Sequence, residues 1–171
     1  KTIALAGTSK QSLSLKNKKE IEEHQYVVDY LKKTLDEFSY KLNVDRDAKP
    51  LKLDYAYHIR TPIHGILIKK IHILKILTRI YPTPALAGYP RNESMELIDS
   101  NENFDRGWYG GSIGIFNTNG DGNFYVPIRS ALIKNSKIYF YSGSGIVGKS
   151  NAEKEWQETK LKLQHLQSIF I

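Results

Sequence analysis

The sequence contains no cysteine and a single methionine, and six arginines stand against nineteen lysines. The absence of cysteine excludes disulfide bridges, thiolate nucleophiles, iron–sulfur ligation and cysteine-rich zinc sites. No apolar run approaches the roughly eighteen residues of a membrane-spanning helix, and no charged-then-apolar leader opens the chain. We therefore expect a cytoplasmic protein with no membrane partner.

The net charge of +7 would ordinarily suggest a nucleic acid or an anionic ligand as a partner. The lysines are scattered or offset by acids, as in residues 18–23, which read Lys-Lys-Glu-Ile-Glu-Glu. This arrangement favours a solvated surface over a nucleic-acid patch, so we expect no nucleic-acid partner. The 171 residues, 40% of them apolar, are enough for one domain with one substantial core.

Hydrophobic spacing predicts both helices and strands. Apolar residues recur at helical spacing over residues 18–41, and residues 71–80 and 93–102 are shorter helix candidates. Residues 40–44 and 51–59 are predicted to be extended, and residues 109–116, 124–133 and 137–142 to form an antiparallel meander. A last helix is expected to start at Ser150 with Glu153 in a capping box. The fold class is therefore α+β, an antiparallel sheet packed against helices.

Three familiar motifs fail in context. Residues 143–148 spell Gly-x-Gly-x-x-Gly, but no second strand ending in an acid follows, as a dinucleotide site requires. Residues 117–122 imitate the start of a calcium loop, yet position twelve is Ile128 and a hairpin turn fits better. His58, His64 and His72 lack the helical spacing and thiolate companions of a zinc site.

A different set of polar and glycine residues would lower the stability of a domain that had no binding or catalytic role. The helix over residues 18–41 carries the pair Glu23-His24, and a glycine-rich turn at residues 143–147 precedes a helix bearing Glu155, Glu158 and Lys162 on one face. Glutamates from two helices suit Mg²⁺, the turn offers N–H groups to an anion, and Arg129, expected inside a strand, could clamp a carboxylate. The alternative is that these side chains are solvated and pair with one another at the surface.

Blocks along the chain resemble the chorismate-binding enzyme family, in the same order as in that family. They are Leu-Ala-Gly-Thr at residues 5–8, Glu-Glu-His-Gln-Tyr-Val-Val at 22–28, His-Ile-Arg-Thr-Pro at 58–62, Pro-Thr-Pro-Ala-Leu at 82–86, Asp-Arg-Gly-Trp-Tyr-Gly-Gly at 105–111, Ile-Arg-Ser-Ala at 128–131, Gly-Ser-Gly-Ile-Val at 143–147 and Glu-Trp-Gln-Glu-Thr at 155–159. The blocks at residues 82–86 and 105–111 resemble isochorismate synthases in particular. Salicylate synthases are close relatives and remain an alternative.

The resemblance implies Mg²⁺-dependent isomerisation of chorismate to isochorismate, in a menaquinone or siderophore pathway. It implies Glu23 and Glu158 as Mg²⁺ ligands, with Glu155 as a nearby or water-mediated partner. Arg129, the Gly143 backbone and Lys162 would hold substrate carboxylates. The other positions that match the chorismate site are Gly7, Thr8, His58, Ala85, Leu86 and Tyr109.

The sequence also departs from the family pattern. The family's lysine base and glutamate acid lie upstream of the block at residues 5–8, so both are expected to lie outside residues 1–171. Tyr81 replaces the more usual histidine, and Ser142 and Ser144 replace alanines. We therefore expect residues 1–171 to be the C-terminal part of a single chorismate-binding catalytic domain. An upstream polypeptide is a possible partner, and the chain alone should turn over little or nothing. A non-catalytic remnant of the fold is the other alternative.

Overall fold

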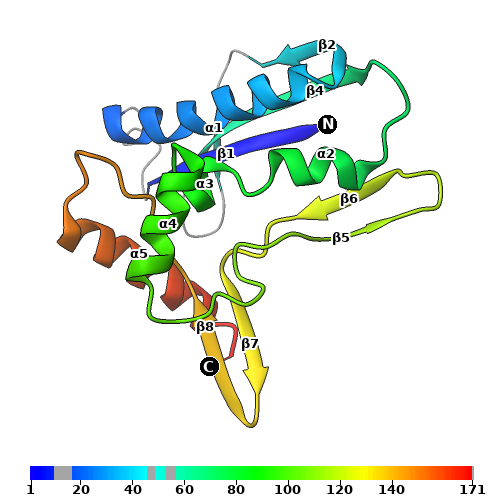
Figure 1. The fold of residues 1–171 in the computed structure, drawn as a ribbon. Coiled ribbons are helices and arrows are strands. Elements are labelled where there is room, and N and C mark those ends of the chain that lie inside the picture. Colours follow the sequence, from blue (N-terminus) through cyan, green and yellow to red (C-terminus); the bar gives the residue numbers. More distant parts are fainter. Residues whose placement is uncertain (10–16, 46–48, 53–56, 171) are drawn as a thin grey trace.

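A computed structural model describes residues 1–9, 17–45, 49–52 and 57–170, except for the side chains of Thr8 and His165. Parts of the predicted turn at 45–50 and of the predicted strand at 51–59 lie outside the described residues. Figure 1 shows two regions, a sheet covered by a long helix and a pair of hairpins with a C-terminal helix beside them.

The main sheet is built on one long strand, β4 (Tyr57–Leu67), which has neighbours along both edges. β1 (Thr2–Ser9) pairs with β4 along one edge, with a register shift between Ala6 and Thr8. On the other edge, β3 (Lys49–Lys52) pairs with the first part of β4 and β2 (Ser39–Val44) with the last part. Every pairing is antiparallel.

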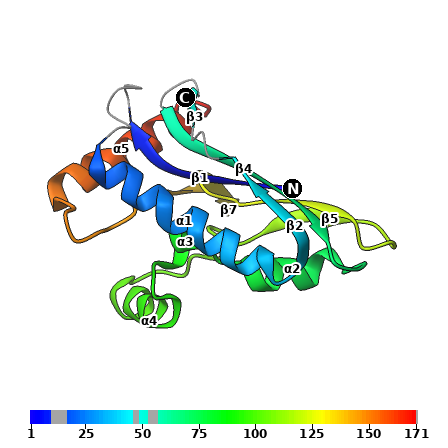
Figure 2. The ribbon, with the colours of Figure 1, turned by 90° about the horizontal axis from the view of Figure 1, so that it is seen from above.

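The core lies between this sheet and helix α1 (Lys18–Asp36), which crosses one face of the sheet in Figure 2. Side chains from β1 and β4 alternate in and out of the sheet, and α1 presents an apolar stripe to the inward-facing ones. The buried cluster consists of Ala4, Ala6, Val27, Val28, Leu31 and Ile63. The small side chains of Ala4 and Ala6 on β1 let α1 approach the sheet closely. This close packing places the start of α1 near the bulge in β1.

Helix α1 ends earlier than the predicted boundary at residue 41. The N–H of Phe38 bonds to the carbonyl of Leu35 in a turn, and the chain enters β2 at Ser39. Residues 39–41 therefore pair with β4 instead of extending the helix, because the strand satisfies their backbone groups. The extended segment predicted at residues 40–44 is confirmed as β2. The helices expected near 71–80 and 93–102 are confirmed as α2 (Ile73–Ile80) and α4 (Arg91–Asn101). Between them, α3 (Pro84–Ala87) forms one short helical turn.

The predicted three-stranded meander is wrong in its connections. Among the described strands, β5 (Ile113–Phe116) pairs only with β6 (Gly122–Tyr125), and β7 (Ser130–Lys134) only with β8 (Lys137–Tyr141). Pro127 and Arg129 break the expected strand, since proline lacks the N–H of a ladder and Arg129 adopts a positive φ of 50°. The hairpin turn at residues 117–122 is confirmed, with Asn117 Oδ1 accepting from the N–H groups of Asn119 and Asp121.

The last helix, α5 (Ala152–Gln167), begins two residues later than the predicted start at Ser150. Asn151 caps it by accepting from the N–H of Lys154, while Ser150 Oγ accepts from the N–H of Val147 in the preceding turn. The predicted fold class is confirmed, because antiparallel sheets and helices make up the structure. None of the helices in the described part of the chain has the length and apolar character needed to cross a bilayer.

Candidate functional site

The start of α1 presents acidic and basic side chains on one face. Lys19, Glu20, Glu23 and His24 lie within six residues, so three- and four-residue spacings bring their side chains together. Glu20 and His24 are buried, and Glu23 is half-buried. His24 Nε2 lies 2.8 Å from Thr61 Oγ1 on β4, which anchors this turn of the helix to the sheet.

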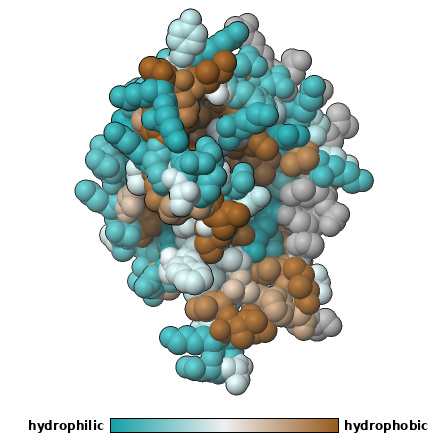
Figure 3. Space-filling model, turned by 90° about the vertical axis from the view of Figure 1, so that its right-hand side faces the viewer, coloured by the Kyte–Doolittle hydropathy of each residue, from teal (hydrophilic) through white to brown (hydrophobic). Residues whose placement is uncertain are grey.

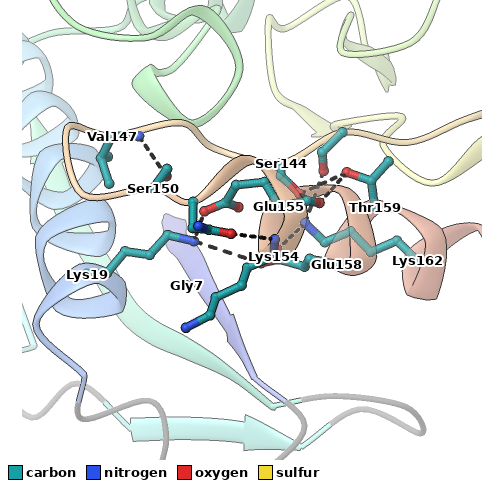
Figure 4. Close-up of polar contacts among 12 residues, drawn as sticks. Gly7, Lys19, Ser144, Val147, Ser150, Lys154, Glu155, Glu158, Thr159 and Lys162 are labelled. Carbon is teal, nitrogen blue, oxygen red and sulfur yellow. Dashed lines mark hydrogen bonds and ion pairs between the residues drawn. The ribbon is translucent and has the colours of Figure 1, made fainter.

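Helix α5 brings a matching set of charges to the same place, as Figure 4 shows. Lys19 Nζ donates to Glu155 Oε1 at 2.5 Å and lies 4.0 Å from Glu158 Oε2. Lys162 Nζ lies 2.7 Å from Glu158 Oε1 and donates to the Gly143 carbonyl at 3.0 Å. Segments 136 residues apart in the chain therefore share one cluster of charges.

The glycine turn before α5 closes this cluster. A Cβ at Gly145 would lie 2.7 Å from Glu23 Oε1, so the Glu23 carboxylate sits directly against the turn and would have to move if residue 145 carried a side chain. Ser144 Oγ reaches the Glu155 carbonyl at 3.2 Å and Thr159 Oγ1 at 3.0 Å, which ties the turn to α5. The glycine at 145 thus lets the Glu23 carboxylate approach the turn closely.

The electrostatics of the cluster favour a further positive charge. Burial, with the negative charges of Glu20 and Glu158, raises the pKa of Glu23 from 4.5 to about 7, although Lys162 and Lys19 act against this rise. Burial lowers the pKa of Lys19, but the hydrogen bond to Glu155 and the surrounding carboxylates outweigh it and raise that pKa overall. Because Glu158 acts on the pKa of Glu23, the two predicted ligands lie on the same side of the molecule.

A second group of polar side chains comes from the sheet and the break before β7. His58 is buried, with Nδ1 3.3 Å from the Gly7 carbonyl and Nε2 3.1 Å from Arg129 Nη2. Burial lowers the pKa of His58, and the nearby charge of Lys162 lowers it further. A neutral ring that donates from Nδ1 and accepts from Arg129 at Nε2 fits both contacts.

Arg129 does not lie inside a strand as predicted. It occupies the break between β6 and β7, where the positive φ of 50° turns its guanidinium toward His58. Burial lowers the pKa of Arg129, and the negative charge of Glu158 opposes that change. Arg129, His58 and Gly7 therefore adjoin the glutamate cluster from the side of the sheet.

The remaining predicted residues lie at the other end of the glycine turn. Leu86 and Tyr109 help to line a cavity of about 440 Å³, together with Tyr81, Met95, Arg106 and Gly110. The Tyr109 hydroxyl would lie 2.9 Å from a Cβ at Gly143, so Tyr109 connects this cavity with the glycine turn. Ala85 is exposed on α3 and does not line the cavity. The side chain of Thr8 lies outside the description, and its backbone lies in β1 directly after Gly7.

Residue-level reasoning missed two members of the cluster, Lys19 and Glu20. Their helical spacing from Glu23 was available in the sequence, because residues three and four positions earlier share its face. The alternative that Glu155 is a solvated side chain is wrong, since it is only 5% exposed. The pairing of Glu158 with Lys162 is confirmed.

The carboxylates fit a hard cation by two observations. Glu155 Oε2 is buried and has no hydrogen-bond partner among the described residues. Burial, followed by the negative charges of Glu20 and Glu158, raises the pKa of Glu23, and a bound cation would favour the ionised carboxylate. Carboxylate oxygens are the ligands that Mg²⁺ prefers. Among the described residues, however, no three acidic or histidine side chains already converge on one point as a metal centre. Lys19 and Lys162 instead hold Glu155 and Glu158 by ion pairs.

Comparison with known proteins gives a consistent family. A sequence-family profile described as "Chorismate binding enzyme" matches residues 4–171. The chain is 38% identical over 168 residues to the salicylate biosynthesis isochorismate synthase of Pseudomonas aeruginosa, covering 95% of this chain and 35% of that protein. It is 34% identical over 150 residues to anthranilate synthase component 1 of Neisseria gonorrhoeae, covering 86% of this chain and 30% of that protein.

The fold agrees with a solved structure. MenF, the menaquinone-specific isochorismate synthase of Escherichia coli, superposes with a TM-score of 0.84 at 31% identity, covering 99% of this chain and 42% of that one. The chain thus spans about a third of the length of the two curated relatives and under half of the solved chain.

Proposed function

Because the chain belongs to the family of chorismate binding enzymes, we propose that it forms the metal- and substrate-binding part of an isochorismate synthase. The proposed reaction is the isomerisation of chorismate to isochorismate, in which water adds at one ring carbon while a hydroxyl leaves from another. The observation that carries the proposal is the meeting of Glu23 with α5 at the glycine turn. Without that contact, residues far apart in the sequence would not form one site.

We propose Mg²⁺ as the cofactor, held by Glu23 and Glu158 with Glu155 nearby. The buried, hydrogen-bond-free Oε2 of Glu155 and the raised pKa of Glu23 support this assignment. A bound Mg²⁺ would orient a substrate carboxylate and offset its charge. The two carboxylates come from different helices, so the spacing of α1 and α5 decides how well they can share a cation.

The chain's cations and turn are proposed to hold the two carboxylates of chorismate. Lys162 is 13% exposed and reaches the Gly143 carbonyl, so its ammonium lies beside the turn whose N–H groups can bind an anion. Arg129 approaches from the break before β7 and can offer paired N–H groups to a second carboxylate. His58, kept neutral by burial, would position Arg129 through Nε2 without adding positive charge.

The pocket wall for the ring is proposed to come from Leu86 and Tyr109. Both line the cavity of about 440 Å³, and Tyr109 stacks on Tyr141 with ring centroids 5.6 Å apart. That stack holds the Tyr109 hydroxyl against Gly143. Gly7 and Thr8 belong to the bulged part of β1 beside His58, and Ala85 lies next to Leu86 on α3.

A base to activate water and an acid to protonate the leaving hydroxyl are also needed. We propose that both come from an additional polypeptide segment that completes the domain. The hairpins support this: Ile115 on β5 is 76% exposed and Ile133 on β7 is 64% exposed. Figure 3 shows brown side chains gathered toward the lower end of the molecule, where β7 and β8 lie in Figure 1. Two-stranded hairpins are marginal alone, so further strands would stabilise them.

The test is calorimetric titration of Mg²⁺ and then chorismate into the wild-type protein and two variants. Glu158→Gln should weaken Mg²⁺ binding at least about tenfold, because it removes one charged ligand. Lys162→Met should weaken chorismate binding by a similar factor. Lys154→Met, on the exposed side of α5, is the matched control and should change neither. If the wild-type protein binds neither Mg²⁺ nor chorismate, the proposal is wrong.

A turnover assay separates the enzymes within the family. The protein should be mixed with a separately expressed polypeptide carrying the unmatched part of Escherichia coli MenF, and the products analysed by chromatography. Isochorismate without pyruvate is expected from an isochorismate synthase, whereas pyruvate release would indicate a salicylate synthase. Binding without turnover in that mixture would favour the non-catalytic alternative.

A further inference from the structure

Lys19 occupies an unusual place for a lysine in the first turn of a helix. Its side chain is only 24% exposed, and its ammonium lies between Glu155 and Glu158 of α5 rather than in solvent. Neither the family resemblance nor the proposed function above assigns this residue a role. Its position is set by α1, which is anchored to the main sheet by a buried core.

Helix α5 depends on this contact because its backbone packs elsewhere. Among the described elements, the backbone of α5 packs mainly against β8, in the second hairpin. The ion pairs of Lys19 therefore join two helices that are carried by different sheets. A shift of α5 relative to α1 would change the distance between Glu158 and Glu23.

Among the described residues, Lys19 is the one cation that pairs with the Glu155 carboxylate. Glu155 is 5% exposed, its Oε1 accepts from Lys19 at 2.5 Å, and its Oε2 is buried without a hydrogen-bond partner. A buried carboxylate that loses its only cation is strongly unfavourable. Without Lys19, the chain would relieve this cost by moving α5 away from α1 so that Glu155 reaches water.

We propose that Lys19 is a positioning residue that holds the acidic face of α5 against α1 without any metal. It keeps Glu158 opposite Glu23 in the empty site, ready for a divalent cation. The use of those carboxylates by a cation rests on the proposed function, but the positioning itself does not. Lys19 is thus a built-in cation that assembles the site from α1, whereas Lys162 pairs with Glu158 from one turn further along α5, beside Gly143.

The experiment is amide hydrogen exchange of the protein in EDTA, comparing wild type with Lys19→Met. We expect exchange in the first turns of α5 to accelerate about tenfold to a hundredfold, the range set by loss of a hydrogen bond to a charged group. Amides of β1 and β4 should keep their wild-type rates, because the core under α1 is unchanged. Lys18→Met, next to it on α1 and exposed, is the matched control and should leave α5 within about twofold of wild type.

A double-mutant cycle tests whether Lys19 acts through Glu155. In the Glu155→Gln background no buried charge is left to compensate, so Lys19→Met should change α5 exchange by less than about threefold. Equal acceleration in both backgrounds, or none in the wild-type background, would overturn the proposal. Should Lys19→Met fail to fold, Lys19→Arg and the double variant still decide the matter, since both are expected to fold with α5 protected.

Addition of Mg²⁺ distinguishes this proposal from the proposed function. If both hold, Mg²⁺ restores slow α5 exchange in Lys19→Met, because it replaces the missing positive charge. Loss of protection in EDTA without rescue by Mg²⁺ would support Lys19 as the positioning residue and contradict the metal site. Wild-type protection that itself requires Mg²⁺ and is unaffected by Lys19→Met would support the metal site and refute the role of Lys19.

Discussion

The Glu23 carboxylate should make the stability of the protein depend on pH in a way that one substitution removes. Burial and the charges of Glu20 and Glu158 raise its pKa from 4.5 to about 7 in the folded state. Below pH 4.5 the Glu23 carboxyl is protonated in both the folded and the unfolded state, so it does not make the free energy of unfolding depend on pH. Between pH 4.5 and 7 the folded protein retains the proton that the unfolded chain releases, so stability falls as the pH rises.

The magnitude follows from the size of that rise. One pKa unit corresponds to about 1.4 kcal/mol, so a rise from 4.5 to about 7 corresponds to about 3 kcal/mol. Glu23→Gln cannot ionise and escapes this cost. Relative to wild type, the free energy of unfolding of Glu23→Gln should therefore increase by about 3 kcal/mol between pH 4 and pH 8.

The assay is urea unfolding in EDTA at pH values from 4 to 8, followed by circular dichroism. Glu96→Gln, at an exposed position on α4, is the matched control, and its difference from wild type should stay constant with pH. A difference between Glu23→Gln and wild type that is flat over this range, or that changes in the opposite direction, would refute the reasoning. Repeating the series with Mg²⁺ should reduce the wild-type pH dependence, because a bound cation favours the ionised carboxylate.

Three further substitutions test separate contacts. Gly145→Ala places a Cβ 2.7 Å from Glu23 Oε1 and should weaken Mg²⁺ binding at least about tenfold by calorimetry, whereas Gly148→Ala, with nothing within 4 Å, should not. Arg129→Lys loses the paired donors and should weaken chorismate binding about tenfold with unchanged Mg²⁺ binding; equal affinity would remove Arg129 from the substrate site. Arg106→Gln breaks a double contact with Glu102 at 30% exposure and should lower the free energy of unfolding by about 1 kcal/mol. Arg79→Gln, whose pair with Glu37 is 57% and 48% exposed, should change it by less than about 0.5 kcal/mol, and an equal loss would contradict the burial argument.

Much of the fold was predictable because local patterns and tertiary contacts agree. α1 begins at Lys18 as predicted, and α2 and α4 lie within two residues of their predicted starts. The errors occur where pairing partners decide the outcome. The helix predicted over residues 18–41 overlaps the extended segment predicted at 40–44, and pairing with β4 decides that β2 begins at Ser39. β4 itself extends through Pro62 to Leu67, which local propensity at residues 66–80 obscured.

The candidate site was predictable in part for a different reason. The face of α5 that carries Glu155, Glu158 and Lys162 follows from helical spacing alone. Glu23 was also a candidate from the sequence, as part of a Glu-His pair within a helix. That it meets Glu158 came from the family resemblance, since nothing in the local sequence says which helices meet. Arg129 was placed in a strand because a positive φ at a non-glycine residue has no reliable sequence signal.

The functional and structural interpretations of the charged residues are therefore not exclusive. An ion pair between Glu158 and Lys162 was the alternative to a binding site, and the structure contains that pair at 23% and 13% exposure. A solvent-exposed ion pair would contribute little to the free energy of unfolding, and its removal would have little effect on stability. Here Lys19 and Lys162 pair with the carboxylates of Glu155 and Glu158, whose side chains are 6% and 23% exposed. Beside them, burial and neighbouring carboxylates raise the pKa of Glu23 to about 7. The lysines compensate part of the negative charge of the carboxylates. The negative charge that is left uncompensated would bind a divalent cation.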